Sequence, residues 1–419
     1  MERSYVVAFN RDRDFYQLPA SLAAVGKLQS LVTDLYLPDA LEGGWLSRTL
    51  GLGHRHCGAV PSSLVRWSPE ALWLQMTSLR IAKNERQRSE VFRRIDASLS
   101  RVAGREAQRS GAGLFLYSGY ALEAFEMVQN ADAPRLLFVY HPQGDHVRRI
   151  LEEDFSRYPE VEFSHRRHLG EIAVNEGNRV AEEIRRATGV ACASTFTAES
   201  IRPCSDIGVS VVPYGCFPPV HANFGISRGS ARPQVLFVGQ GTQRKGLHHL
   251  LKVWREGLYR DAELTLVVNQ VDPGIAGMID LLPTSPQVLE GLTRQELANE
   301  FERADVFVLP SLVEGFGLVY LEALAAGCHV IGTFNTGLPD LRAPEEVATV
   351  VPPGDLEALH AALRTATTRA AKEGFDRDAI RSFAATRSWE NFRAGIRKFV
   401  DDSERIWNKS GDFELPAKY

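Results

Sequence analysis

The residues best placed to do chemistry lie in one segment, DVFVLPSLVEGFGLVYLEALAAGCHVIGT, which runs from residue 305 to residue 333. It contains two glutamates eight positions apart, Glu314 and Glu322, and a glycine-rich loop follows the first of them. The apolar residues 306–309 predict a strand, a helix follows the loop and ends near Gly327, and a second strand comes after it. This order makes a βαβ unit, in which unpaired amides at the start of the helix favour a phosphate at the carboxyl edge of the sheet.

Each residue type in this segment has a chemical use. Gly315 and Gly317 have no Cβ, so the backbone there can approach a diphosphate closely. The carboxylate of Glu322, further along the helix, can accept hydrogen bonds from both hydroxyls of a ribose. Spacing alone leaves an alternative open, because a strand, a tight turn and a packing helix also form ordinary core units.

The complete pattern resembles the E-x7-E signature of retaining glycosyltransferases of family 4, within the glycosyltransferases group 1 superfamily, which have the GT-B fold. Glu314 and Glu322 occupy its two acidic positions, and the flanking PS, EGFG, EA and AG elements also match. The resemblance implies that Glu314 binds the sugar of a nucleotide-sugar donor and that Glu322 binds its ribose. It also implies contacts between the diphosphate and the backbone of the intervening loop, at Gly315, Phe316, Gly317 and Leu318.

A second segment, VLFVGQGTQRKGLHHLL at residues 235–251, resembles the strand and loop that open the donor-binding domain of this family. Lys245 and the glycine after it match a characteristic Lys-Gly pair, although Gln240 stands where the family has an arginine. A cation near the departing diphosphate stabilises the charge that develops there, so Lys245 and Arg244 are predicted to do this without a metal. A solvated Lys-Gly turn is the alternative. The remaining donor-binding candidates are Gly239, Gln240, Gly241 and, against the nucleobase, Leu292.

The first half of the chain contains candidates for the other side of the cleft. His141 follows a predicted strand, and relatives often have a histidine near this place, close to the donor sugar; a buried core histidine is the alternative. Where relatives commonly have a Gly-Gly loop after the first strand, this chain has FNRDRDFYQLP. The acceptor-binding candidates are Arg11, Asp12, Gly119 and Tyr120.

The triplet Asp12-Arg13-Asp14 has the DxD spacing that holds a divalent metal in a different glycosyltransferase fold. Its place at the end of the first strand favours charges of an acceptor loop or of the surface. The five cysteines form no CxxC pair and therefore predict reduced thiols, with neither a zinc site nor a disulfide framework. His165 and His168 flank two arginines and are predicted to lie on a solvated face.

Length and composition set the class of protein. A chain of 419 residues with 44% hydrophobic and 24% charged residues is typical of a soluble protein of two domains, which excludes disordered and fibrous classes. The N-terminus has no secretory signal, and no apolar run approaches the roughly 20 residues that span a membrane. We therefore expect a cytoplasmic protein, with no cofactor and no nucleic-acid partner.

The pattern of apolar runs predicts an α/β fold of two Rossmann-like domains facing across a cleft. Short apolar runs separated by helix-period segments are typical of doubly wound parallel sheets. Predicted strands of the first domain are 5–9, 113–117, 135–140, 191–194 and 210–212, and those of the second are 235–239, 263–268, 306–310 and 329–332. The predicted organisation is an acceptor domain at 1–220 with a basic helical insertion at 42–110, a linker at 221–233, a donor domain at 234–387, and a C-terminal segment at 388–419 whose helix returns to the first domain.

Residues 80–109 of the insertion contain nine Lys or Arg against four Asp or Glu. A solvated basic face and a surface that docks on anionic lipid at the inner face of the cell membrane are both compatible with this pattern.

The resemblance implies a retaining, metal-independent transferase of the hexosyl type that uses a nucleotide-sugar such as a UDP-sugar or GDP-sugar. A glycan or lipid-linked glycan is the expected acceptor, in the synthesis of an envelope or extracellular polysaccharide. Two other classes remain open: a sugar-nucleotide epimerase of similar fold, and a catalytically silent carbohydrate-binding subunit.

Overall fold

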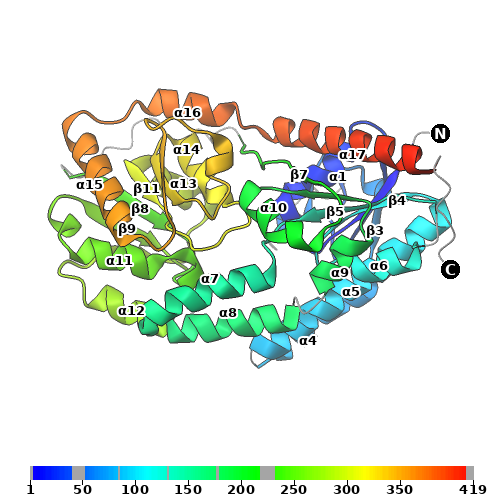
Figure 1. The fold of residues 1–419 in the computed structure, drawn as a ribbon, viewed down its shortest axis with the longest axis horizontal. Helices are drawn as coiled ribbons and strands as arrows, with labels where there is room; N and C mark the ends of the chain where they lie inside the picture. Colours follow the sequence, from blue (N-terminus) through cyan, green and yellow to red (C-terminus); the bar gives the residue numbers. More distant parts are fainter. Residues whose placement is uncertain are drawn as a thin grey trace.

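The computed structural model describes residues 3–39, 52–83, 85–129, 132–175, 179–217 and 232–411, so most of the predicted linker lies outside the described residues. These residues form two separate sheets, each surrounded by helices (Figure 1). All pairings between named strands are parallel, as the alternation of apolar runs and helices predicts. The predicted α/β fold class is confirmed.

The first sheet has seven strands in the order β3-β2-β1-β4-β5-β6-β7. Its strands are β1 (Tyr5–Ala8), β2 (Leu28–Thr33), β3 (Val65–Trp67), β4 (Gly113–Tyr117), β5 (Arg135–Val139), β6 (Gly189–Cys192) and β7 (Val209–Val211). The central strands are buried on both faces, which explains why sequences such as GLFLY and RLLFV are continuous apolar runs.

The helices of the first domain are α1 (Gln17–Ala23), α3 (Pro69–Met76), α4 (Ser78–Ile81), α5 (Glu85–Ser110), α6 (Leu122–Met127), α7 (Gly144–Arg157), α8 (Glu162–Asn175), α9 (Arg179–Arg186) and α10 (Thr195–Ile201). The long helix α5 packs against the sheet at β1 and β2 and against α3, α6 and α8. Its inward face therefore belongs to the core of the domain.

Two strands of the first sheet were missed from the sequence. β2 mixes polar and apolar residues, and β3 has only three residues, of which two are exposed. Because β3 lies at residues 65–67, the insertion predicted at 42–110 is not purely helical: it supplies the edge strand of the sheet as well as α3, α4 and α5.

The second sheet has six strands in the order β10-β9-β8-β11-β12-β13. Its strands are β8 (Gln234–Val238), β9 (Glu263–Val267), β10 (Gln287–Leu289), β11 (Val306–Val308), β12 (His329–Thr333) and β13 (Ala348–Val351). Its helices are α11 (Leu247–Arg255), α12 (Pro273–Asp280), α13 (Arg294–Arg303), α14 (Leu318–Ala326), α15 (Leu356–Lys372) and α16 (Arg377–Ala385).

Local sequence fixes the ends of the two helices that flank β11. Helix α13 begins with a capping box, in which Thr293 and Glu296 bond to each other's backbone amides. Helix α14 ends at Gly327, whose φ of 87° is the left-handed conformation that a glycine adopts at little cost.

The C-terminal helix α17 (Trp389–Gly411) crosses from the second domain back to the first, as predicted (Figure 1). Lys27 of the first domain lies 2.9 Å from carboxylate oxygens of both Asp401 and Glu404. The hydroxyl of Tyr5 donates to Glu404 at 2.9 Å, and Phe399 packs on the sheet against Phe115. Phe392 and Phe399 of α17 are thus buried on the first domain, whereas Ile406 further along the helix is exposed.

Helices α7 and α8 also join the domains. The side-chain amide of Gln243, in the second domain, donates to Leu151 O and to Asp154 Oδ2, each at 2.8 Å. The backbone amide of Gln243 donates to Ser164 Oγ at 2.7 Å. The loop that carries Gln243 is therefore fixed on three buried acceptors of the first domain.

The prediction of a solvated face for His165 and His168 is wrong. Both lie buried on α8, where His165 stacks on Phe155 at a ring-centroid distance of 4.4 Å. The neighbouring arginines hid this packing in the sequence, although Arg167 is itself paired with Asp272 of the second domain at 2.8 Å.

Within the described residues, no helix is both long enough and apolar enough to cross a membrane. The prediction from hydropathy agrees with this finding.

Candidate active site

The loops at the carboxyl edges of the two sheets line two adjoining cavities. One, of about 510 Å³, is lined by the loop after β1, by Tyr140, His141 and Tyr214, and by Lys245 with residues 314–319 of the second domain. The other, of about 610 Å³, shares part of this lining and continues along α5 and α8. Ligands of doubly wound sheets bind at such carboxyl edges.

Lys245 and Glu314 form an ion pair in the smaller of these cavities, and each stands on a loop that follows a strand of the second sheet. Ser311 Oγ also donates to Glu314, at 3.3 Å. Glu314 is buried; burial opposes its ionisation, but the charges of Lys245 and Arg244 prevail and lower its pKa to about 2. Glu314 is therefore ionised at neutral pH, and its carboxylate holds the side chain of Lys245 in a fixed place.

Arg244 and His141 meet from opposite domains. A guanidinium nitrogen of Arg244 lies 3.1 Å from Nε2 of His141. Burial, reinforced by the charge of Arg244, lowers the pKa of His141 to about 3. The imidazole is thus neutral, and because Nε2 accepts from the guanidinium, the ring proton is on Nδ1.

The glycine-rich loop from Gly315 to Leu318 lines the same cavity as the ion pair. The hydroxyls of Ser194 and Thr197 donate to Gly315 O at 2.6 and 3.2 Å, so the first domain holds this loop. A Cβ on Gly315 would lie 2.0 Å from the carbonyl oxygen of Tyr140. Glycine is therefore required at position 315 not only for the predicted approach of a diphosphate but also because the backbones of the two domains are in contact there.

The glycine of the Lys-Gly pair has a comparable reason. Gly246 has a φ of 68°, and a Cβ there would lie 1.9 Å from the carbonyl oxygen of Pro310. Only glycine lets the turn after β8 pack against the loop after β11. This contact brings Lys245 within reach of Glu314.

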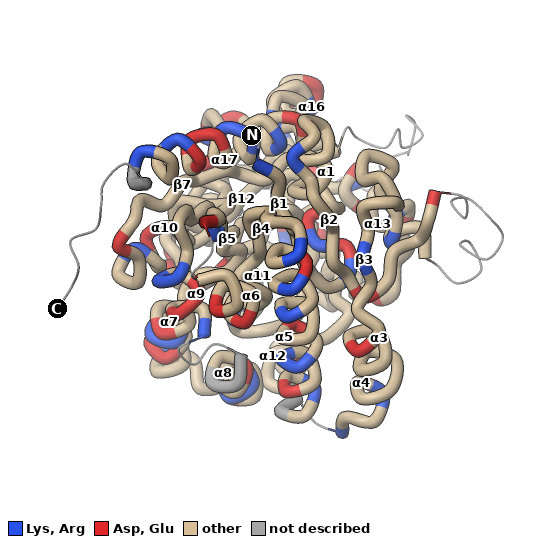
Figure 2. The backbone as a smooth tube through the Cα atoms, turned by 90° about the vertical axis from the view of Figure 1, so that its right-hand side faces the viewer, with Lys and Arg blue, Asp and Glu red and all other residues tan. Residues whose placement is uncertain are grey.

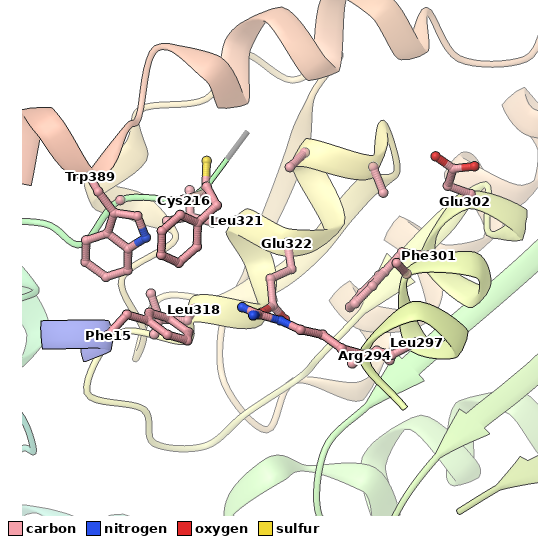
Figure 3. A pocket seen from close by; sticks show the side chains of 15 residues that line it. Phe15, Cys216, Arg294, Leu297, Phe301, Glu302, Leu318, Leu321, Glu322 and Trp389 are labelled. Atoms are coloured by element: carbon pink, nitrogen blue, oxygen red, sulfur yellow. The ribbon is translucent and has the colours of Figure 1, made fainter. Parts of the chain in front are cut away.

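Glu322 lines a third cavity, of about 130 Å³, and not the one that holds Glu314 (Figure 3). Aromatic side chains from distant segments form one wall, namely Phe15, Phe217 and Trp389. Arg294 points toward Glu322, while Glu302 lies apart from both (Figure 3). Burial raises the pKa of Glu322, and the charge of Arg294 opposes the rise. The two glutamates of the signature therefore face different pockets on either side of the start of α14.

The other donor-binding candidates lie around the turn after β8 and the start of α13. Gln240 lines the larger cavity together with Arg244, so both reach the interdomain space. Gly239 and Gly241 form backbone hydrogen bonds to Val267 and Gln270, and Leu292 packs partly buried on the core. These three shape the loops and line none of the three cavities.

The loop after β1 holds four non-glycine residues in left-handed conformations: Arg11, Asp14, Phe15 and Tyr16 have φ values from 44° to 65°. Such backbone conformations are costly without glycine, and they concentrate at functional sites. Asp12 and Arg11 line the smaller cavity, and Arg11 also lines the larger one. Asp14 also lines the smaller cavity but is buried; burial raises its pKa to about 7, and Tyr117 donates a hydrogen bond to it.

Gly119 and Tyr120 both line the larger cavity. The carboxylate of Glu183 holds their turn by accepting hydrogen bonds from the amides of Gly119, Ala121 and Leu122 at 2.7, 3.0 and 3.1 Å. The structure thus brings three residues predicted to bind the acceptor, Arg11, Gly119 and Tyr120, to the same cavity. Nothing in the sequence indicated that Glu183 holds the turn that carries two of them.

Arg13 is a site residue that the sequence analysis missed. It lines both interdomain cavities, and its guanidinium carbon lies 3.8 Å from the ring centroid of Tyr140. The rings of Tyr117 and Tyr120 are each 5.7 Å away. Its position within the DxD triplet drew attention to the two aspartates instead of the arginine between them.

Two doubly wound domains whose carboxyl edges face one another, with a C-terminal helix that returns to the first domain, define the GT-B class of folds. A solved glycosyltransferase from Rickettsia africae has the same fold, with a TM-score of 0.60 over 97% of this chain and 99% of that one. At 14% sequence identity this likeness concerns the fold alone.

Within that class, residues 232–369 match the family model of glycosyl transferases group 1, and the second domain belongs to this family. The prediction of group 1 from the E-x7-E and Lys-Gly motifs is thereby confirmed. Its narrower form, family 4, stays a prediction.

Two mycobacterial proteins illustrate the relationship. An MMP α-(1→4)-mannosyltransferase from Mycolicibacterium hassiacum is 31% identical over 241 residues, which cover 55% of this chain and 56% of that protein. A D-inositol 3-phosphate glycosyltransferase from Mycobacteroides abscessus is 36% identical over 156 residues, or 37% of this chain and 33% of that protein. The matches thus span from a third to about half of these relatives.

Proposed function

We propose that this protein is a retaining glycosyltransferase of family 4 that moves a hexosyl-type sugar from a nucleotide-sugar donor to a glycan or lipid-linked glycan. The carrying observation is that Lys245 meets Glu314, and Arg244 meets His141, at two adjoining interdomain cavities that share His141 in their lining. A pocket with two cations, one fixed carboxylate and a neutral histidine suits a sugar attached to a departing diphosphate.

In the proposed mechanism, Lys245 and Arg244 neutralise the diphosphate as its bond to the sugar breaks. Both cations are held before reaction, Lys245 by Glu314 and Arg244 by His141, so little reorganisation is required. The backbone of residues 315–317 adds amide donors at the start of α14. No metal is needed for charge neutralisation in this scheme.

The sugar itself would lie between Glu314 and His141. An ionised carboxylate accepts hydrogen bonds from sugar hydroxyls, and a neutral imidazole exchanges one with them. The acceptor hydroxyl attacks the anomeric carbon from the side of the leaving group, the sugar–phosphate bond breaks, and a phosphate oxygen takes the proton. Retention of anomeric configuration follows from this front-face geometry.

The nucleoside would extend toward Glu322. The ribose hydroxyls donate to this carboxylate, and the aromatic wall of Phe15, Phe217 and Trp389 offers apolar surface beyond it. A uridine or a guanosine diphosphate sugar is the expected donor, as the family resemblance implies.

An envelope or extracellular polysaccharide is the proposed product, made on the cytoplasmic side of the membrane. Support for peripheral membrane contact comes from four exposed apolar side chains on β3, α3 and α4, namely Trp67, Trp73, Met76 and Ile81. Lys and Arg recur along the neighbouring helix α5 (Figure 2). Apolar side chains beside basic ones are the pattern of a surface that docks on anionic lipid.

The proposal is tested by thermal unfolding with UDP, GDP, ADP and dTDP, followed by turnover of the corresponding nucleotide sugars. A nucleotide at 100 times its dissociation constant adds about 2.7 kcal/mol of stability. Release of free nucleotide together with a product of retained anomeric configuration, read by NMR, supports the proposal. An isomerised free sugar would indicate an epimerase, and nucleotide binding without any turnover would indicate a silent binding subunit.

A further inference from the structure

The larger interdomain cavity, of about 610 Å³, is lined by far more positive than negative side chains. Seven arginines line it, Arg11, Arg13, Arg88, Arg93, Arg167, Arg179 and Arg244, against the two carboxylates Asp96 and Glu171. A cavity of one charge sign attracts ligands of the opposite sign.

Three of these arginines are already neutralised by ion pairs: Arg93 by Glu90 at 2.7 Å, Arg167 by Asp272 at 2.8 Å and Arg179 by Glu123 at 2.6 Å. Arg167 and Arg179 thereby join different elements, whereas Arg93 pairs within α5, and none of the three charges is free for a ligand.

The other four, Arg11, Arg13, Arg88 and Arg244, have no carboxylate within 4 Å in the part of the chain that the structure describes. The nearby Asp96 compensates them only in part, because burial raises its pKa to about 7 even against the charges of Arg13 and Arg179. Arg244 lies beside His141, at the end where the donor diphosphate is proposed to bind. In the first domain, Arg11, Arg13 and Arg88 thus remain without an ion-pair partner among the described residues.

Arg88 stands on the α5 wall of the cavity, Arg11 lies against that wall, and Arg13 interacts electrostatically with Asp96 on it. Arg88, Phe92 and Asp96 are four residues apart on α5 and all line the cavity, so they share one face of the helix. The guanidinium carbon of Arg11 lies 5.5 Å from the ring centroid of Phe92, which places Arg11 against that face.

Arg13 has a buried donor that an anion could satisfy. Its Nε atom is buried without a hydrogen-bond partner within the described chain. Asn10, which also lines the cavity, likewise has a buried Oδ1 without a partner. An unpaired polar group away from water is costly, and like charges in a partly buried space repel. A ligand with anionic and hydroxyl groups would relieve both costs.

We propose that the acceptor carries a phosphoryl group, which Arg11, Arg13 and Arg88 bind at the α5 end of the cavity while its reacting hydroxyl points toward Lys245 and His141. This inference rests on the proposed function and specifies its acceptor as a phosphate ester. A phosphorylated sugar and a polyprenyl-phosphate-linked sugar share this chemistry.

The test measures binding to the full chain with the donor site first saturated by the nucleoside diphosphate that stabilises it most. Calorimetric titrations with inorganic phosphate, with hexose 6-phosphates and with the parent hexoses compare charged and neutral probes. We expect phosphate to bind, and at least one hexose phosphate to bind about tenfold more tightly than its parent hexose, which is about 1.4 kcal/mol. In a parallel arm, sedimentation compares phosphatidylcholine vesicles with and without a polyprenyl phosphate.

Arg88→Ala and Arg11→Gln should each remove most of the preference for the phosphorylated probe. Arg105→Ala is the matched control, because Arg105 is an exposed arginine of the same helix that does not line the cavity. Preference for hexose phosphate assigns a soluble acceptor, and preference for the lipid phosphate assigns a lipid-linked one. Equal binding of charged and neutral probes, or a preference that survives both substitutions, overturns the inference.

The experiments distinguish a failure of the acceptor inference from a failure of the transferase proposal. If nucleoside diphosphates bind and their sugars turn over while no probe distinguishes phosphate, the acceptor inference is wrong and the transferase stands. If no nucleotide stabilises the protein, the transferase proposal itself fails, whatever the arginines bind.

Discussion

Arg244 of the second domain lies 3.1 Å from Nε2 of His141 in the first, so a single hydrogen bond joins the loop after β8 to the end of β5. The neutral imidazole accepts this bond because burial and the guanidinium charge lower its pKa to about 3. The same guanidinium acts on Glu314, whose pKa falls to about 2. This contact therefore links the two domains, and the guanidinium also helps to keep His141 neutral and Glu314 ionised.

Lys245→Ala should lower kcat by about 10²- to 10³-fold, because it removes a cation that stabilises charge in the transition state. Steady-state kinetics with the best nucleotide sugar measure the effect, and Lys245→Arg should recover part of the rate. Lys372→Ala, at an exposed position on α15, is the matched control. Unchanged turnover in the alanine variant would remove Lys245 from the mechanism.

Glu322→Ala should weaken donor binding more than it slows turnover, since its carboxylate is proposed to hold the ribose away from the reacting bond. Loss of hydrogen bonds to a charged group predicts a rise of about 10- to 100-fold in the KM for the donor. Glu302→Ala tests specificity, because Glu302 lines the same pocket but lies apart from Glu322. Similar effects of both changes would speak against a ribose contact.

The protein should lose stability in acid through its buried histidines. Burial lowers the pKa of four of them: His141 and His168 to about 3, His248 and His329 to about 4. The unfolded chain takes up these protons near pH 6.5 and the folded chain does not, so stability falls as pH drops from about 6.5 toward 4.

The size of this loss is up to about 1.4 kcal/mol per pH unit for each histidine. Urea unfolding at a series of pH values measures it. His329→Gln, remote from the cleft and stacked on Phe375, should reduce the slope between pH 6.5 and 4. A slope identical to that of the unchanged protein would contradict this assignment.

The ionisation of Asp96 should make the stability of the protein fall as pH rises, which is the opposite of the effect of the histidines. Burial raises the pKa of Asp96 to about 7, so the folded protein keeps a proton that the unfolded chain releases near pH 4. Its contribution to stability is greatest below pH 4 and is lost as pH rises through 7. Asp96→Asn should therefore become more stable than the unchanged protein on going from pH 4 to pH 8, by on the order of 1 to 3 kcal/mol.

Thermal and urea unfolding at both pH values measure this difference, with Glu106→Gln, on the same helix but away from the cavity lining, as the control. A stability difference that does not change with pH would show that Asp96 is ionised in the folded protein.

Gln243→Leu should loosen the contact between the domains. The change leaves Leu151 O and Asp154 Oδ2 without the amide that now donates to both at 2.8 Å. Asp154 Oδ2 keeps its contact with His248 Nε2 at 3.1 Å, but two buried hydrogen bonds are lost, one of them to a charged group. This predicts a loss of about 2 to 3 kcal/mol in the free energy of unfolding. Gln295→Leu, at an exposed site on α13, should change stability by much less. Equal losses in the two variants would argue against a joining role for Gln243.

A fall in kcat with an unchanged KM for the donor is also expected in Gln243→Leu. Gln243 precedes Arg244 and Lys245 in the same short turn, so its release moves both cations without removing either.

Most of the sheet architecture could be predicted from the sequence, because buried parallel strands are continuous apolar runs. The strands around β4, β5, β8, β9 and β12 were found in nearly the right place. β2, β3, β10 and β13 were missed because these edge and near-edge strands are short, are partly exposed or contain polar residues, and so have no such pattern. The burial of His165 was missed because it depends on Phe155 and on Gln243 of the other domain.

The sequence by itself determined the βαβ units, the Lys-Gly and E-x7-E motifs and the returning C-terminal helix, since each depends on local periodicity or on a short spacing. Only the tertiary structure decided which residues share a cavity. Arg13, Arg88 and Asp96 stand on a loop and a helix far apart in the chain, yet they meet across one cavity with Arg244. Spacing along the chain sets local conformation, whereas charge balance in a cleft depends on which elements the packing of the core brings together.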